Sequence, residues 1–221
     1  MNVTIYKPEL DVINSIAPKK NAHRLDLSYV QFIFEYNKTK KEQNIQIVVT
    51  DAMRMLVVQK HIKNVLVKNG KNKTFEISPK MLSVLFDEYN QRGKKGRHLG
   101  KQEKLSVAEI PFVAIKNIAS IIENKIQYPG WKLIDKKSKN KEDKNVFSFG
   151  ETTDYRTPIV AHFKKECGFN LSFLNDFSRF VKRINAPTVD FFQKDYKSVS
   201  YTTIIHAWAV YKFYLMPVSV L

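Results

Sequence analysis

The segment of this sequence that is best suited to chemistry is a short stretch rich in lysine, arginine and glycine. Residues 92–104 hold six basic side chains, one acidic side chain and three of the seven glycines. A segment of this composition does not pack as a core element, so we predict a flexible basic loop. Such a loop can follow a phosphate backbone and become ordered on binding it, whereas the plainer alternative is an exposed connector. The predicted phosphate contacts are Arg92, Lys94, Lys95, Arg97, Lys101 and Lys104.

A second basic cluster lies near the end of a predicted helix. Arg179, Lys182 and Arg183 gather in its last turns, where they would contact phosphate rather than base edges. We therefore add them to the predicted nucleic-acid contacts. Residues 157–184 also read as helix, glycine turn, helix, which keeps a sequence-specific DNA-binding regulator as an alternative. That match is weak, because Lys164 falls where the first helix of such a motif needs a small side chain.

The charge balance of the whole chain supports a polyanionic partner. There are 37 Lys and Arg against 21 Asp and Glu, which gives a net charge of +16 and a pI near 9.7. Such an excess repels itself in a compact state, so it is useful or neutralised by a partner. Nucleic acid is the first candidate and an anionic membrane surface the second. A bias toward lysine codons is the alternative that needs no partner.

Aromatic residues point to single strands rather than duplex. The chain has ten Tyr, fifteen Phe and two Trp. Single-stranded nucleic acid is held in basic grooves lined by rings on which bases stack. Most of these rings are also expected to fill the core.

A search for catalytic and metal-binding patterns finds no convincing site. The histidines show no metal-ligand spacing, and the glycines form no phosphate-binding loop. His162 and Cys167 are five residues apart on one predicted helix, so they do not face each other well. We therefore predict no catalytic residue, no metal and no cofactor. A metal-dependent nuclease built from scattered carboxylates remains an alternative, with these candidates: Asp51, Glu76, Asp87, Glu88, Asp135 and Asp154.

The elements that must position these residues are predicted to be mainly helices. Glycine is scarce, which disfavours open-sheet enzymes and β-sandwiches. Apolar periodicity and capping residues favour helices over residues 51–68, 79–91, 106–125, 157–168, 171–184, 188–196 and 200–215. Residues 25–36 fit helix or strand, with helix favoured, and residues 45–49 a short strand. The predicted fold class is mainly α, with two lobes and a minor contribution from short strands.

The predicted organisation has arms at both ends. Residues 1–24 form an extended N-terminal arm, residues 25–131 a helical lobe, residues 132–145 a charged loop or linker, and residues 146–221 a second helical lobe with an apolar tail. An exposed apolar tail is unfavourable in water unless a partner covers it, so we expect the arms to link copies into a homo-oligomer. The single Cys167 indicates a reducing compartment. With no export signal and no long apolar run, we expect a cytoplasmic or otherwise intracellular protein without a transmembrane segment.

These inferences predict a non-enzymatic nucleic-acid-binding protein. Its expected mode is nucleocapsid-like: it coats single-stranded RNA or DNA through a basic groove, without strong sequence preference. A sequence-specific DNA-binding regulator or replication protein is the first alternative. A metal-dependent nuclease is the second.

Overall fold

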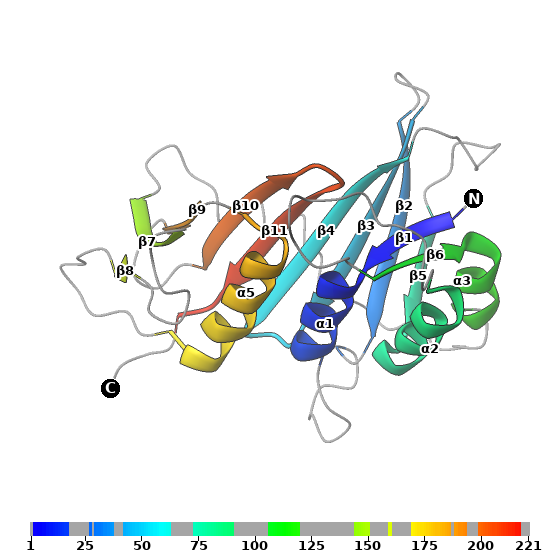
Figure 1. Cartoon of the computed structure of the whole chain (residues 1–221), viewed down its shortest axis with the longest axis horizontal. Coiled ribbons are helices and arrows are strands. Elements are labelled where there is room, and N and C mark those ends of the chain that lie inside the picture. The colour runs from blue at the N-terminus through cyan, green and yellow to red at the C-terminus, as the bar shows by residue number, and fades with distance from the viewer. Residues whose placement is uncertain are drawn as a thin grey trace.

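The structure is a computed structural model, and most of its described residues lie in antiparallel strands. It describes residues 2–17, 27, 29–37, 42–62, 73–90, 106–119, 144–150, 159–160, 169–186, 188–193 and 199–217. A nine-stranded sheet has the order β5-β2-β3-β4-β11-β10-β9-β7-β8, and a two-stranded sheet pairs β1 with β6. The four helices of the described part cover one side of the large sheet (Figure 1). The prediction of a mainly helical fold is therefore wrong.

The elements follow one another along the chain as strands interrupted by single helices. Their bounds are β1 (Asn2–Tyr6), α1 (Lys7–Ile16), β2 (Val30–Asn37), β3 (Glu42–Thr50), β4 (Arg54–Ile62), β5 (Lys73–Ile77), α2 (Pro79–Tyr89), β6 (Val107–Pro111), α3 (Phe112–Ala119), β7 (Lys144–Gly150), β8 (Ile159–Val160), α5 (Leu171–Arg183), β9 (Thr188–Gln193), β10 (Ser200–His206) and β11 (Ala209–Leu215).

Strand β4 replaces a predicted helix, and its burial explains the error. Apolar side chains are buried on both faces of this strand, so the alternation that marks a half-buried strand is missing from the sequence. Thr50 and Asp51, residue types that can cap a helix, accept instead from backbone N–H groups of a turn. Asp51 Oδ1 accepts from the N–H groups of Met53 (3.0 Å) and Arg54 (2.8 Å), while Ala52 takes a positive φ of 74°. This turn sends the chain back as β4, antiparallel to β3.

The predicted helix over residues 200–215 is a β-hairpin. Strands β10 and β11 pair from Ser200↔Leu215 to His206↔Ala209, with Ala207 and Trp208 at the turn. Thr202 and Ile204 are buried, while their neighbours Tyr201, Thr203 and Ile205 are partly or fully exposed, which is the alternation of a strand. The run of β-branched and aromatic residues fits a strand better than a helix, and tertiary pairing decides the outcome.

Elsewhere the predictions are partly confirmed. Helix α2 begins after Ser78, whose hydroxyl accepts from Met81 N at 3.3 Å, and α5 and β3 are also where the sequence placed a helix and a strand. The helix expected over residues 106–125 begins only at Phe112, because residues up to Pro111 form β6. The expected helices over residues 25–36 and 188–196 are wrong, since strands β2 and β9 lie there. Residues 157–168 lie largely outside the described residues.

Residues 2–17 form a strand and a helix, where an extended arm was predicted over residues 1–24. Strand β1 pairs with β6 from Asn2↔Pro111 to Tyr6↔Val107, and α1 follows directly. Helix α1 buries Leu10, Val12 and Ile13 in the core. The division into two lobes joined at residues 132–145 stays a prediction, because most of that linker lies outside the described residues.

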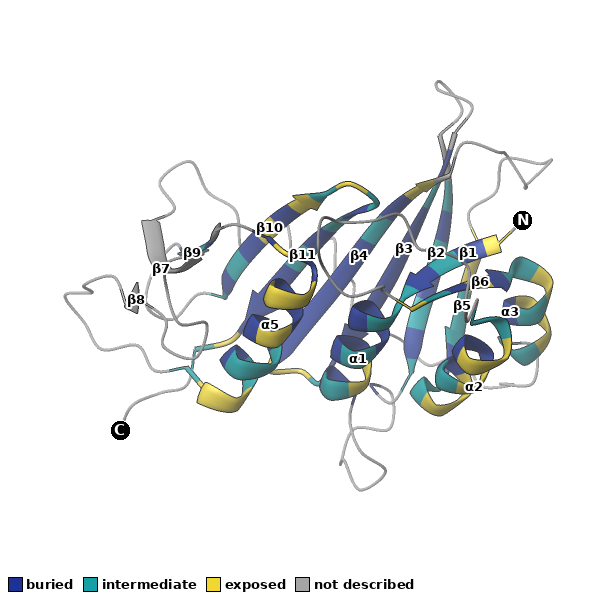
Figure 2. Cartoon of the chain, in the orientation of Figure 1, coloured by how far each residue is buried: buried dark blue, intermediate teal, exposed yellow. Residues whose placement is uncertain are grey.

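One main core fills the space between the large sheet and its helices (Figure 2). We call this side of the sheet the helix face. A smaller buried cluster of Val48, Met55, Val57 and Tyr214 lies on the opposite side of the sheet. No helix in the described part of the chain is long and apolar enough to cross a membrane.

Candidate nucleic-acid interface and the joint beneath it

The excess of positive charge lies outside the described elements. The described residues hold eleven Lys and Arg and eleven Asp and Glu, so the remaining segments carry the whole excess of +16. The six predicted contacts of the loop, from Arg92 to Lys104, belong to those segments and are therefore not placed. Whether the described part of the chain also offers a basic surface for nucleic acid depends on where its eleven Lys and Arg side chains lie.

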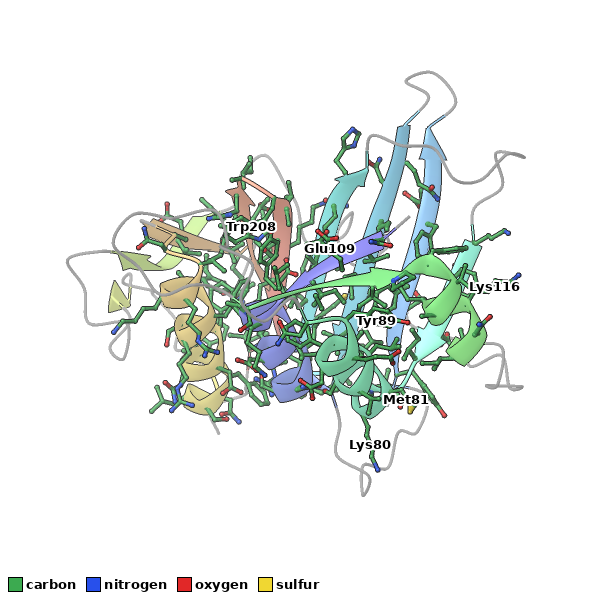
Figure 3. All side chains as sticks on the ribbon, turned by 45° about the vertical axis from the view of Figure 1, so that its right-hand side comes forward. Lys80, Met81, Tyr89, Glu109, Lys116 and Trp208 are labelled. Atoms are coloured by element: carbon green, nitrogen blue, oxygen red, sulfur yellow. The ribbon has the colours of Figure 1, made fainter. Side chains whose placement is uncertain are left out.

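Most described cations lie on the helix face. Six of the eleven project from its helices, and all six are exposed or partly exposed: Lys7, Lys80, Lys116, Arg179, Lys182 and Arg183. The side chains of Lys80 and Lys116 are seen at the edge of this face in Figure 3. Two other cations, Arg54 and Lys60, are buried in ion pairs beneath the helices. The helices also carry partly or fully exposed acids, which are Asp11, Asp87, Glu88 and Asp176.

The predicted cluster on α5 is a real spatial group, and it extends onto α1. Arg179, Lys182 and Arg183 are all exposed on the last turns of α5. Arg183 forms an ion pair with Asp11 of α1, and Asp11 also binds Lys7 at 2.8 Å. One carboxylate thus links a cation from each helix. Sequence reasoning missed Lys7 because the i,i+4 pair with Asp11 is informative only once residues 7–16 are known to be helical.

A pairing between β4 and β11 joins the two halves of the large sheet under α1 and α5. The Cα partners run from Arg54↔Leu215 to Gln59↔Val210. We call this antiparallel pairing the seam. Strands before residue 119 lie on one side of it and strands after residue 144 on the other. The helix on each side, α1 and α5, packs against its counterpart across the seam (Figure 1).

A buried polar network lies at one end of the seam. The carboxylate of Glu9 accepts from Tyr6 N (2.9 Å), Lys60 Nζ (2.6 Å) and the Tyr211 hydroxyl (2.7 Å). Glu9 and Tyr211 are fully buried, and Lys60 is 7% exposed. The Tyr211 oxygen in turn accepts from the Trp208 indole N–H at 2.6 Å. Burial lowers the pKa of Lys60 while Glu9 opposes that shift, and burial followed by the Glu9 charge raises the pKa of Tyr211.

A second group of ion pairs, centred on Arg54, lies at the other end of the seam. The guanidinium of Arg54, 6% exposed, donates to Asp51 (2.9 Å), to Asp176 of α5 (2.8 Å) and to the carbonyl oxygen of Ser15 in the last turn of α1. Its planar group also lies 4.3 Å from the ring centre of Phe173. Five donors in a fixed plane make arginine suited to such a multiple contact. Strand β4 therefore holds both helices, with Lys60 at one end and Arg54 at the other.

A hollow of about 490 Å³ opens beside the first network. Residues of β1, β4 and the β10–β11 turn line it. The Tyr6 and Trp208 rings stack with their centres 4.3 Å apart, and His206 lies 3.8 Å from Trp208. Burial lowers the pKa of His206. Trp208, which donates to Tyr211, is one of the lining residues.

The described residues offer little support for a nuclease. They contain no group of three or more His, Cys, Asp or Glu that could hold a metal ion. Asp51 is engaged by Arg54, and Glu76 accepts a hydrogen bond from Gln31 at 3.3 Å. Asp87 and Glu88 are exposed on α2. Asp135 and Asp154 lie outside the described residues.

Comparison with known proteins identifies a fold but no family. No protein-family model matches the chain, and no curated protein matches it. Among solved structures, the Helicobacter pylori β clamp in complex with diflunisal aligns with a TM-score of 0.58 and 11% identity, over 96% of this chain and 64% of the clamp. The β subunit of DNA polymerase III from Thermotoga maritima gives 0.57 and 11%, over 100% and 66%.

Further similar structures extend the comparison. The DNA polymerase sliding clamp of Caulobacter crescentus aligns with a TM-score of 0.55 and 11% identity, over 99% of this chain and 65% of the clamp. The Helicobacter pylori clamp has also been solved bound to a DNA ligase peptide. The chain thus spans slightly less than two thirds of the first of these bacterial proteins. Over that length its fold is that of the bacterial sliding clamps.

Proposed function

We propose that this protein is a DNA-associated clamp of a replication system, and that its helix face is turned toward the duplex. The observation that carries the proposal is the clamp fold together with the cations on that face. Lys7, Arg179, Lys182 and Arg183 lie over the seam, with Lys80 and Lys116 farther along the same side. A phosphate backbone bound there would release counterions without reading sequence.

The basic loop is part of the same proposal. The basic loop follows α2 and precedes β6 in the chain. Its predicted contacts are Arg92, Lys94, Lys95, Arg97, Lys101 and Lys104. We propose that they add phosphate contacts to those of α5. The nucleocapsid-like reading is not retained, because it rested on a helical two-lobed fold. Coating of single-stranded RNA has no support in the clamp fold.

We propose that several copies assemble to complete the clamp. The sheet edges of the described part of the chain support this proposal. In the described part of the large sheet, β5 and β8 each have a neighbour on one side only. Unpaired strand edges are ready sites for pairing with another chain. This replaces exchangeable terminal arms as the proposed route to an oligomer.

A protein-partner surface is proposed on the side opposite the helices. Met53 and Met216 are 41% and 37% exposed, and Met216 N donates to the Met53 carbonyl oxygen at 2.8 Å. Along the chain, each lies two residues from a member of the second buried cluster, Met55 or Tyr214. Flexible methionines are common on surfaces that accept several partners. Because a similar clamp has been solved with a DNA ligase peptide, we propose that replication enzymes dock here by short peptides.

Duplex binding measured against salt concentration tests the orientation. Arg179→Ala removes one cation from the helix face, and Lys212→Ala removes one from the opposite face, because the flanking Tyr211 and Phe213 point into the main core. If each phosphate contact contributes about 0.9 to the slope of log affinity against log salt, the Arg179 variant loses about that amount. The Lys212 variant keeps the wild-type slope. Equal losses in both variants would contradict the proposed orientation.

A further inference from the structure

Three polar side-chain contacts among the described residues join the part of the chain before residue 119 to the part after residue 144 across the seam. Tyr211 donates to Glu9, Arg54 binds Asp176, and Arg183 binds Asp11. The first two are buried or nearly so, and the third lies at the surface. The seam is therefore fixed by directional contacts as well as by strand pairing and apolar packing.

The position of α1 depends on these contacts more than on its apolar side. Leu10, Val12 and Ile13 give this helix a hydrophobic stripe, and such stripes tolerate small shifts of packing. The Glu9 carboxylate does not tolerate such a shift, because three donors converge on it from β1, β4 and β11. Moving α1 by one turn would separate the buried carboxylate of Glu9 from the ammonium of Lys60, and breaking a buried ion pair is strongly unfavourable.

We propose that Glu9, Lys60 and Tyr211 are positioning residues for the DNA-facing surface. They fix the seating of α1 over the seam, so that Lys7 of α1 stands beside Arg183 of α5 and the cations of both helices form one surface. The inference rests on the proposed function for the role of that surface, but the positioning itself is independent of it. None of the three residues contacts the nucleic acid.

We expect the buried network to hold α1 in a single position rather than to raise the free energy of unfolding. Replacing a buried ion pair by apolar residues of similar volume is often neutral for stability, whereas removing one partner is costly. The triple variant Glu9→Leu, Lys60→Met, Tyr211→Phe removes the buried charges and the hydroxyl together, and only neutral groups lose a partner: Tyr6 N, the Thr4 carbonyl oxygen and the Trp208 indole. We expect its Tm to fall by no more than that of Tyr211→Phe alone, because no charge is left buried without a partner, while α1 is no longer held in one position over the seam.

Two readouts test the proposal on the full chain. Hydrogen exchange of the α1 amides should be about tenfold faster in the triple variant, the factor that corresponds to one lost hydrogen bond. The slope of duplex affinity against salt should fall by about one phosphate contact, since Lys7 and Arg183 no longer act together. Wild-type exchange in α1 together with a wild-type slope would overturn the proposal.

Two further variants keep the outcome interpretable. If the triple variant does not fold, Tyr211→Phe alone carries the exchange comparison, because it leaves the Glu9–Lys60 ion pair in place. Val113→Ala, at an exposed position on α3, is the control and should change neither readout. If the wild-type protein binds duplex without salt dependence, the proposed function fails, and the exchange of α1 still decides the positioning role.

Discussion

The hydroxyl of Tyr211 provides a sharp test of how the seam is held. Tyr211→Phe deletes one oxygen from a fully buried ring and leaves its packing intact. That oxygen donates to the Glu9 carboxylate at 2.7 Å and accepts from Trp208 at 2.6 Å. A hydrogen bond to a buried charge contributes about 1.5–3 kcal/mol, and the indole contact contributes less, about 0.5–1.5 kcal/mol, because both of its groups are neutral. We expect a loss of about 3 kcal/mol.

For a chain of this size, that loss lowers the Tm by roughly 6–12 °C. Thermal unfolding followed by circular dichroism measures it, with Tyr29→Phe as the matched control for deleting a tyrosine hydroxyl elsewhere. Trp208 fluorescence in a Trp131→Phe background should shift as well, because the indole loses its acceptor. A Tm change below about 1 °C, equal to that of the control, would refute the reasoning.

The same residue predicts a response to alkali. The pKa of Tyr211 is raised in the folded state, so above pH 10 the unfolded chain releases a proton that the folded chain keeps. Stability contributed by this group is therefore lost as the pH rises above that value. In the Tyr211→Phe variant, the free energy of unfolding should therefore fall less steeply as the pH rises above 10.

Three further predictions concern single side chains. Ala52→Gly should raise stability by about 0.5–1 kcal/mol in chemical denaturation, because Ala52 has a φ of 74° that glycine adopts without strain; a loss of stability would contradict this. Glu76→Gln should raise the Tm at pH 7 but not at pH 4. Burial raises the pKa of Glu76 above its usual 4.5, so the ionised form of this side chain lowers the stability of the folded state at neutral pH. His206→Gln should weaken the loss of stability on acidification below pH 6.5, since burial lowers the pKa of His206 and the unfolded state takes up the proton first; an unchanged pH profile would count against it.

Local signals in the sequence were sufficient for some elements. Ser78 followed by Pro79 marks the start of α2, and Asn170 caps α5 by accepting from Ser172 N at 2.9 Å. These helices have one apolar side and a capping residue, so their pattern is complete within the segment. Both were predicted correctly.

The strands were missed because their pattern depends on partners far along the chain. Strand β4 is buried on both faces between β3 and β11, so its side chains do not alternate between apolar and polar. The capping ability of Asp51 then made a turn look like a helix start. No local signal reveals that residue 211 will lie beside residue 58, more than 150 positions away.

The candidate site was predicted only in part. Arg179, Lys182 and Arg183 do stand together on α5, since they are neighbours in sequence. Their link to Lys7 through Asp11 arises from the packing of α1 against α5, which requires the sheet. The charged pair Glu9 and Lys60 gave no signal at all, because 51 residues separate its members and nothing in the sequence shows that both are buried.

A clamp of the kind we propose encloses duplex DNA rather than coating a strand. The most direct measurement is retention of the assembled protein on a closed circular duplex, before and after a single cut by a restriction enzyme. A clamp should stay on the circle at a salt concentration that abolishes electrostatic binding, and should be lost once the DNA is linear. Equal retention on circular and linear DNA, or stronger retention on single strands, would contradict the account.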